Sequence, residues 1–258
     1  MTDTPSAAHY FYPNRMARII LNSMRSELGP EHYSEVLRAA GQEALLEKTP
    51  LGNLDRQFPF ESVSALQAGA EEVFGVRAGR QANYRIGRGT LSLGLKDFDP
   101  LLGIADLPMR LVPLGMKFRV GLDVFARVFN QFTDQVVKLS ETATHHLWII
   151  ERCPVCWQRH TEEPCCQLAG GLLEEAIYWG TGGRRFKVEE TACIAAGQLA
   201  AGLGAAALPA DGAALDDPQV MGGGLGELDD LVGELVEDAG KYIQPDAKFH
   251  AQRHEPHR

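Results

Sequence analysis

Several common signatures of enzymes are missing from this chain. It has no P-loop, no Gly-x-Gly-x-x-Gly after an expected strand and no His-Glu-x-x-His, so none of the nucleotide or metal sites that these motifs build is indicated. Gly87-Arg88-Gly89 is too short for a phosphate-binding loop. A redox enzyme needs an electron source, and no nicotinamide or flavin motif is present. No catalytic residue can be assigned from the sequence.

Excess basic charge and long apolar runs are also lacking. The chain of 258 residues carries a net charge of −9, with a sequence pI of about 5.4, which argues against nucleic acid as a partner. No stretch approaches the roughly 18–20 apolar residues that span a bilayer. Residues 1–6 lack the basic and apolar segments of a signal peptide. We therefore expect a cytoplasmic protein.

Cysteine is scarce, but it is concentrated in one region. All five cysteines lie between Cys153 and Cys193, and four of them lie between Cys153 and Cys166. Cytoplasmic cysteine clusters are more often metal ligands or redox thiols than disulfides. Cys153 and Cys156 form a Cys-x-x-Cys knuckle that directs two thiolates at one centre. A cysteine from the pair Cys165-Cys166 can then help to close a tetrahedral site.

Zinc is the ion that such ligands favour, because thiolates are soft and Cys₃ or Cys₄ sets with a knuckle are typical of structural zinc. Adjacent cysteines rarely bind one ion together, so we expect one of Cys165 and Cys166 to be a ligand. His160 is an alternative ligand, or a solvated loop residue. Buried thiols without metal, an iron–sulfur centre and redox chemistry are the competing interpretations. A filled four-coordinate site would be structural, not catalytic.

Apolar periodicity predicts the order of the elements. We expect helices at residues 13–29, 31–46, 61–74 and 107–131, and another from Pro164 to Gly182-Gly183. We expect strands at residues 77–95, 136–141, 144–152 and 185–196. Helices, strands, a helix and a strand in this order predict an α+β fold.

The composition changes after Gly197. Residues 198–226 are dominated by alanine and glycine and predict a flexible linker, because they have few side chains with which to form a core. Residues 227–243 have the pattern of a short acidic amphipathic helix. The predicted organisation is a flexible lead (1–12), one domain (13–197), the linker (198–226), and a short helix with a disordered tail (227–258).

Candidate ligand-binding residues are apolar and lie on the helix expected at 107–131 and near the cysteines. They either line a pocket for a flat apolar ligand or belong to an ordinary core. The candidates are Met109, Met116, Phe118, Phe125, Phe129 and Trp148, and Trp157, Tyr178 and Trp179 flank the cysteines. His145-His146 offers one axial ligand for a tetrapyrrole metal, or a surface histidine. Arg184-Arg185 offers a carboxylate partner, or a solvated turn.

Four segments together resemble the 4-vinyl-reductase-type hydrocarbon-binding domain family, most closely its bacteriochlorophyll-synthesis branch. They are Cys153-Pro154-Val155-Cys156-Trp157, Pro164-Cys165-Cys166, Gly171-Leu172-Leu173-Glu174-Glu175-Ala176 and Phe186 through Gly197. The resemblance is strong over about residues 145–197 and looser back to about residue 10. It places Cys166 as the third zinc ligand, with Cys165 as its alternative, and Cys193 as the fourth.

The resemblance also implies a fold and a function. The fold would be an antiparallel sheet packed with helices, like the ligand-binding fold of trafficking subunits and haem-nitric-oxide-binding domains. Family members hold a small hydrophobic molecule, and some are phenol sensors with a structural zinc. The photosynthetic branch is tied to vinyl-group reduction on a chlorophyllide precursor and looks like an accessory factor. A homodimer, pigment-synthesis enzymes as partners and a place at the edge of the photosynthetic membrane are implied as well.

The chain departs from the family pattern after Gly197. The family has Gly-Asp-x-x-Cys and a closing strand, whereas this chain has Gln198 and Ala201 at the aspartate and cysteine positions. A frameshift is one hypothesis for residues 198–258. The leading functional hypothesis is an accessory protein that holds a chlorophyllide-type tetrapyrrole. The alternatives are a vinyl reductase with an external donor, a sensor module for a small aromatic, and a zinc-ribbon binder of nucleic acid, which the charge disfavours.

Overall fold

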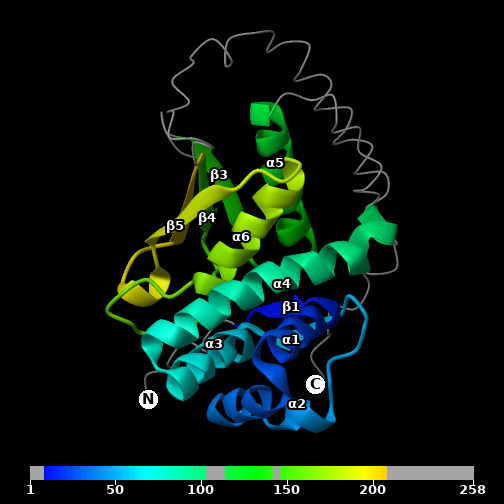
Figure 1. Ribbon diagram of the computed structural model, residues 1–258, viewed down its shortest axis with the longest axis vertical. Helices are drawn as coiled ribbons and strands as arrows, with labels where there is room; N and C mark the ends of the chain where they lie inside the picture. The colour runs from blue at the N-terminus through cyan, green and yellow to red at the C-terminus, as the bar shows by residue number, and fades with distance from the viewer. Residues whose placement is uncertain (1–8, 103–113, 142–145, 208–258) are drawn as a thin grey trace, which may run out of the picture.

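Helices and a four-stranded sheet make up the part of the chain that the computed structural model describes, residues 9–102, 114–141 and 146–207 (Figure 1). The first half contains β1 (Phe11–Pro13), α1 (Asn14–Ala39), α2 (Ala44–Glu47), β2 (Arg56–Pro59), α3 (Phe60–Phe74) and α4 (Val76–Leu102). The second half contains α5 (Leu114–Phe132), β3 (Val137–Glu141), β4 (His146–Ile150), α6 (Gln167–Gly180), β5 (Phe186–Ala192) and β6 (Ala201–Ala207). The antiparallel strands and the helices that pack on them confirm the α+β prediction.

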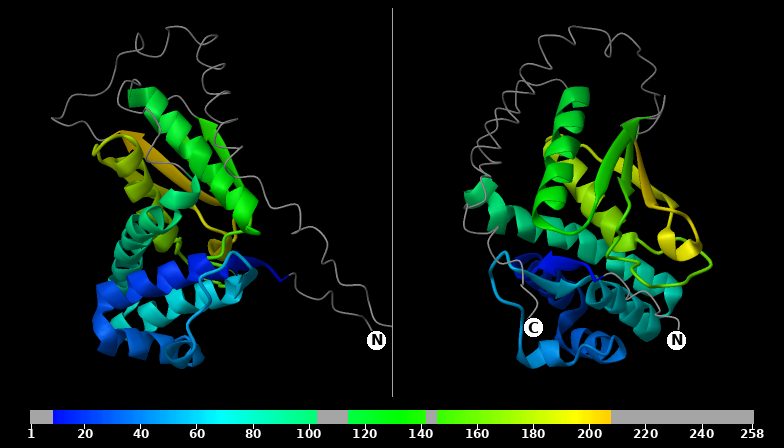
Figure 2. Two further views of the ribbon diagram at one scale, coloured as in Figure 1. Left: turned by 90° about the vertical axis from the view of Figure 1, so that its right-hand side faces the viewer. Right: turned by 180° about the vertical axis from the view of Figure 1, so that it is seen from behind.

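The four-stranded sheet runs in the order β3-β4-β6-β5, and every pair is antiparallel. Helices α5 and α6 cover one face of the sheet, and α4 crosses beneath them against α1 and α3 (Figures 1 and 2). Trp148, Ile150 and Val188 are buried on the covered face, where the ring of Trp148 meets that of Phe129. The hydrophobic core therefore extends from the sheet through α5 and α6 to the helices of the first half.

Glycines mark the helix boundaries of the first half. Gly29 has a φ of 75° and kinks α1, and Gly75 has a φ of 79° and separates α3 from α4. L-residues with side chains rarely adopt this region, so glycine suits both positions. The predicted breaks at Gly29 and Gly75 are confirmed. The helix expected at residues 31–46 instead ends at Ala39, and the four-residue α2 follows it.

The strand predicted at residues 77–95 is wrong, because this segment is part of the long helix α4. The glycines of this segment do not indicate a strand; most of them lie where α4 contacts another helix. A Cβ atom on Gly87 would lie 2.1 Å from the carbonyl oxygen of Leu168, and one on Gly171 would lie 1.9 Å from that of Tyr84. Small residues let helix backbones approach this closely, so α4 and α6 cross almost in backbone contact.

The linker predicted from residue 198 is wrong for residues 201–207, which form strand β6. This strand lies between β4 and β5, and Ala201 to Ala205 are buried. Backbone hydrogen bonds to two neighbouring strands hold it, and these do not depend on large side chains. A closing strand is therefore present, and residues 201–207 do not need a frameshift to explain them.

Other boundaries differ by a few residues. Helix α6 begins at Gln167 instead of Pro164, with Cys166 as its N-cap residue, and β5 ends at Ala192 before a 3₁₀ turn at Ile194–Ala196. The hairpin of β3 and β4 agrees with the predicted pair of strands. Residues 1–8, 107–113 and 208–258 lie outside the described part of the chain. The last of these ranges contains the predicted acidic helix and the tail. None of the described helices combines the length and the apolar character that a bilayer span requires.

Candidate functional site: an apolar cavity beside a thiolate cluster

An apolar cavity of about 90 Å³ lies between α1, α4, α5 and α6. Its lining comes from all four helices and from Tyr12 in β1, and consists of Tyr12, Met16, Ile19, Ile20, Thr90, Leu91, Gly94, Leu95, Val124, Phe125, Val128, Phe129, Leu168 and Leu172. Met16, Leu95 and Val128 are only partly buried, so the cavity reaches the protein surface. The close crossing of α4 and α6 fixes two of its walls.

The polar groups of the cavity wall already have partners within the protein. The Thr90 hydroxyl donates to the carbonyl oxygen of Ile86 at 2.7 Å, and the Tyr12 hydroxyl donates to Gln135 Oε1 at 2.6 Å. No histidine, cysteine or charged side chain is among the described residues that line the cavity. The wall therefore offers apolar contact and few free polar partners.

The structure places the predicted ligand-binding residues in different surroundings. Phe125 and Phe129 line the cavity, whereas Trp148 stands behind it with its ring centroid 6.1 Å from that of Phe129. Phe118 is buried elsewhere, against Phe186 and His146, with ring centroids 4.9 and 4.5 Å away. Met109 lies outside the described residues. Met116 lies in α5, and its side chain is outside the described part.

The thiol groups of all five cysteines gather at one end of α6 and are buried. Cys153 Sγ lies 3.5 Å from Cys166 Sγ, and Cys193 Sγ lies 3.6 Å from Cys166 Sγ. The sulfur atoms of Cys153, Cys156 and Cys166 lie within 4.8 Å of one another. The structure thus brings together the four residues predicted as zinc ligands.

Three separate elements supply these thiols. Cys153 and Cys156 follow strand β4, Cys166 is the N-cap residue of α6, and Cys193 follows strand β5. The segments between them are held by backbone bonds, such as that from the Thr161 amide to the Ala195 carbonyl at 2.9 Å. A bound ion would therefore join the sheet to α6.

Two of the sulfur–sulfur separations in the four-cysteine group are close to those around a zinc ion. With a Zn–S bond of about 2.3 Å, the sulfurs of a regular tetrahedron lie about 3.8 Å apart. The two measured separations from Cys166 Sγ, 3.5 and 3.6 Å, are close to this value. None of the five cysteines is in a disulfide. Zinc in this site would be a structural ion, because four protein ligands leave no open position.

The thiols also prepare the cluster for a cation. Hydrogen bonds from Cys156 and Cys166 lower the pKa of Cys153, and those from Cys156, Cys165 and Cys166 lower the pKa of Cys193, while desolvation opposes both shifts. The same bonds raise the pKa values of Cys156 and Cys166, which act as donors. These opposed shifts arise from hydrogen bonds among the thiols of the cluster.

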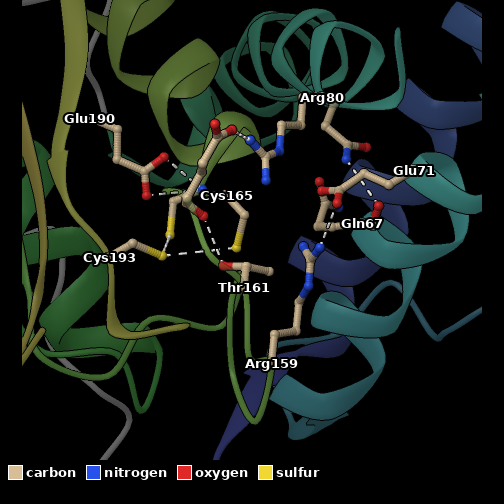
Figure 3. A network of polar contacts seen from close by, with 11 residues as sticks. Gln67, Glu71, Arg80, Arg159, Thr161, Cys165, Glu190 and Cys193 are labelled. Atoms are coloured by element: carbon tan, nitrogen blue, oxygen red, sulfur yellow. Dashed lines mark hydrogen bonds and ion pairs between the residues drawn. The ribbon is translucent and has the colours of Figure 1, made fainter. Parts of the chain in front are cut away.

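Glu190 is a neighbour of the cluster that sequence reasoning missed as a site residue. Both of its carboxylate oxygens accept the Cys166 amide, at 3.0 and 2.8 Å, and burial raises the pKa of the carboxyl to about 8. Its oxygen, Cys166 Sγ and Cys193 Sγ lie within 4.8 Å of one another (Figure 3). The sequence pattern could have indicated it. Glu190 alternates with Phe186 and Val188, so its carboxylate falls on the apolar face of β5, three residues before Cys193.

A buried ion pair stands on the other side of the cysteines. Arg159 Nη2 lies 2.7 Å from Glu71 Oε2, and the two side chains are 12% and 9% exposed. A hydrogen bond with Cys166 lowers the pKa of Cys165 and one with Cys193 raises it. Burial adds to the rise and the Arg159 guanidinium opposes it, so that the pKa is raised overall to about 11. Figure 3 shows the Arg159 side chain directed at Glu71, with Gln67 nearby on α3. This pair connects the cysteine loop to the first half of the protein.

The remaining candidate residues from the sequence belong neither to the cavity wall nor to the cysteine cluster. Arg185 binds Glu174 at 3.1 Å and lies over the ring of Tyr178, so its charge is already paired. Trp157 packs edge-on against Tyr10 and Phe60. His160 is exposed and belongs to neither set of metal-ligating side chains. His145 lies outside the described residues.

Sequence reasoning also missed most of the cavity wall. Leu168 and Leu172 were predicted only to be part of a helix. They are four residues apart and so lie on one face of it, and this face lines the cavity. Leu91 and Leu95 carried the same signal, which was read as strand alternation. Tyr12 was missed because residues 1–12 were predicted to be a flexible lead. This prediction is wrong for Phe11 and Tyr12, which lie in strand β1, and Tyr12 lines the cavity.

Comparisons with known proteins give no family assignment. No family model matches the chain, and no curated protein matches its sequence. Solved structures that match in shape include a mutant H-NOX protein from S. oneidensis, at 8% identity and a TM-score of 0.49 over 76% of this chain and 96% of that one. A mutant H-NOX protein from K. algicida matches at 12% identity and a TM-score of 0.48, over 77% and 97% of the two chains. These scores are too low to transfer a ligand or an activity.

Proposed function

We propose that this protein binds a small apolar molecule, about one aromatic ring in size, in the cavity between α1, α4, α5 and α6. The observation that carries the proposal is the cavity wall, which four helices build almost entirely from aliphatic and aromatic side chains. We further propose that zinc, bound by Cys153, Cys156, Cys166 and Cys193, holds the sheet against α6 beside this cavity. The protein would act as a binding or sensing module.

The cavity volume sets the size of the ligand. Pockets for drug-sized molecules measure roughly 300–1,000 Å³, whereas an engineered apolar cavity of about 150 Å³ binds benzene. The present cavity measures about 90 Å³ and is open to the surface. A single ring or a short hydrocarbon is therefore the class of ligand that the cavity suits.

The chemistry of the wall points to the same class. Because Thr90 and Tyr12 donate their hydroxyl hydrogens to Ile86 and Gln135, the ligand receives no hydrogen bond from them in this arrangement. Their oxygens can still accept one. Binding would come from apolar area and from contact with the rings of Phe125 and Phe129. Toluene should therefore bind at least as well as phenol.

Gly94 offers a direct test, because it lines the cavity and a Cβ atom there would meet nothing within 4 Å. The substitution Gly94→Leu should fill the cavity and weaken toluene binding more than about tenfold. It should not reduce stability, because replacing a helical glycine is favourable by up to about 1 kcal/mol. Isothermal titration calorimetry and a thermal unfolding curve measure the two effects.

The matched control is Gly121→Leu in α5. Gly121 is also helical and also has no atom within 4 Å of an added Cβ, but it does not line the cavity. This variant should bind toluene like the original protein. Equal affinities for all three proteins would place the ligand outside the cavity and contradict the proposal.

A second candidate is an accessory protein that carries a chlorophyllide-type tetrapyrrole for vinyl-group reduction in bacteriochlorophyll synthesis. What supports it is the residue pattern of Cys153–Gly197, which resembles that branch of the hydrocarbon-binding family. Four linked pyrrole rings exceed the present cavity, so α5 would have to move away from α1 and α4. Titration with a magnesium tetrapyrrole, followed by absorbance, separates the candidates: a stoichiometric spectral shift favours the carrier, and consumption of the vinyl group would make it a reductase.

A further inference from the structure

The thiolate cluster contains two adjoining sets of metal-ligating side chains instead of one. In the first set, Cys153, Cys156 and Cys166 lie within 4.8 Å of one another. In the second, Cys166, Glu190 and Cys193 satisfy the same condition. Cys166 belongs to both sets. One zinc ion on the four predicted cysteines would leave Glu190 and Cys165 beside it without a role.

The contacts within the cluster show where the two sets join. Cys166 Sγ lies 3.5 Å from Cys153 Sγ in the first set and 3.6 Å from Cys193 Sγ in the second, so it is the central sulfur. Cys193 Sγ also lies 3.8 Å from Cys165 Sγ. The edge from Cys166 Sγ to Cys193 Sγ therefore adjoins Cys153 through Cys166, and Cys165 through Cys193.

The length of this edge suits two bridging thiolates. Its 3.6 Å is close to the sulfur–sulfur edge of about 3.8 Å expected around one tetrahedral zinc, and two tetrahedra can share such an edge. Each ion then has four protein ligands, two of its own and two shared. Glu190 is already held in place by the Cys166 amide, as outer-shell hydrogen bonds commonly orient metal ligands.

The charge of the group also favours a second cation. Five buried thiols and one half-buried carboxylate converge here, and the nearest fixed positive charge, Arg159, is paired with Glu71. Buried negative groups are costly unless they are neutralised by protons, cations or a metal. A second divalent ion would neutralise this group.

We propose that this cluster is a binuclear site that binds two divalent ions of the zinc type, bridged by the thiolates of Cys166 and Cys193. The first ion is completed by Cys153 and Cys156, and the second by Glu190 and Cys165. This assignment puts the adjacent Cys165 and Cys166 on one ion, contrary to the expectation from the sequence, and rests on the 3.8 Å between Cys165 Sγ and Cys193 Sγ. The second ion rests on the zinc site proposed above, because both bridging ligands belong to it. It does not depend on which molecule occupies the apolar cavity.

Native mass spectrometry of the full chain, reloaded with excess zinc and exchanged into volatile buffer, counts the ions directly. The expected result is two zinc ions for each chain. One ion at saturation would overturn the binuclear site but leave the four-cysteine site standing, and no bound zinc would overturn both. Toluene affinity, measured in parallel, reports separately on the proposed function.

Two variants locate the second ion without touching the first four ligands. Glu190→Gln and Cys165→Ser should each reduce the count from two to one. The control His160→Ala removes an exposed potential ligand from the same loop and should keep two ions. Two ions in both Glu190→Gln and Cys165→Ser would contradict the assignment of these residues.

Cobalt titration tests the bridge. A single high-spin Co²⁺ ion gives an electron paramagnetic resonance signal, whereas two ions joined by thiolates couple and lose much of it. The signal should therefore rise to one equivalent of cobalt and fall between one and two. A signal that rises evenly to two equivalents would show separate ions, and one that stops changing at one equivalent would show a single site.

Discussion

Removing zinc from the proposed four-cysteine site should lower the free energy of unfolding of this protein by at least about 5 kcal/mol, or roughly 15 °C in unfolding temperature for a domain of this size. The reason is the position of the four ligands, which come from the ends of β4 and β5 and from the N-cap residue of α6. Without an ion, four buried thiols lose the interaction that joins these elements. Thermal unfolding followed by circular dichroism, before and after treatment with a chelator, measures the loss.

Two comparisons make this result specific. Cys153→Ser should lose the zinc of the four-cysteine site and unfold well below the temperature of the zinc-loaded original protein. Readdition of zinc should restore the chelated original protein but not the variant. Equal unfolding temperatures with and without metal would mean that the cysteines are buried thiols that stabilise the core only by packing.

Replacement of Gly171 by alanine should destabilise the protein by more than about 4 kcal/mol, which few single substitutions do. The added Cβ would lie 1.9 Å from the carbonyl oxygen of Tyr84 and 3.2 Å from its Cα. Both are backbone atoms, so no rotation of a side chain can relieve the overlap. Helices α4 and α6 would have to separate, which would open the core between them. Urea unfolding monitored by circular dichroism measures this effect.

The matched control is Gly94→Ala, another glycine-to-alanine change within a helix. Because an added Cβ at Gly94 meets nothing within 4 Å, this variant should be unchanged or more stable by up to about 1 kcal/mol. A Gly171→Ala protein with the urea midpoint of the original would show that the α4–α6 crossing is looser than described. The prediction would then fail.

The cysteine positions were the easiest part of the site to predict from the sequence. Cys153 and Cys156 belong to one local knuckle, and two residues only three positions apart stay close together in any fold. Cys193 is far from them in sequence, and only the resemblance to a family placed it with the others. Glu190 was missed because its contact with Cys166 depends on how β5 lies beside α6, which spacing along the chain does not reveal.

The fold was predictable where apolar side chains repeat and less predictable where glycine is frequent. The ends of α3 and the β3–β4 hairpin follow from periodicity and from Gly75. Helix α4 was mistaken for a strand because its glycines weaken the helical pattern, and their purpose appears only when α6 lies against them. Strand β6 was missed because pairing with β4 and β5, not its own composition, determines its structure.

The cavity could be predicted from the sequence only in part. The apolar pattern of their helix left Phe125 and Phe129 as either pocket or ordinary core residues, and both line the cavity. The opposite wall, from Leu91 to Leu95, lies in the helix that was taken for a strand. A pocket between helices is a property of their packing, so the sequence could indicate one wall but not the enclosed volume.

A crystal of the protein soaked with bromobenzene provides the most direct test of the central claim, that a one-ring apolar molecule binds between the four helices. Anomalous diffraction at the bromine absorption edge locates the ligand without reference to the protein atoms. We predict a bromine peak inside the cavity, close to Leu91, Phe125 and Leu172. A saturated soak with no bromine in this cavity would contradict the account.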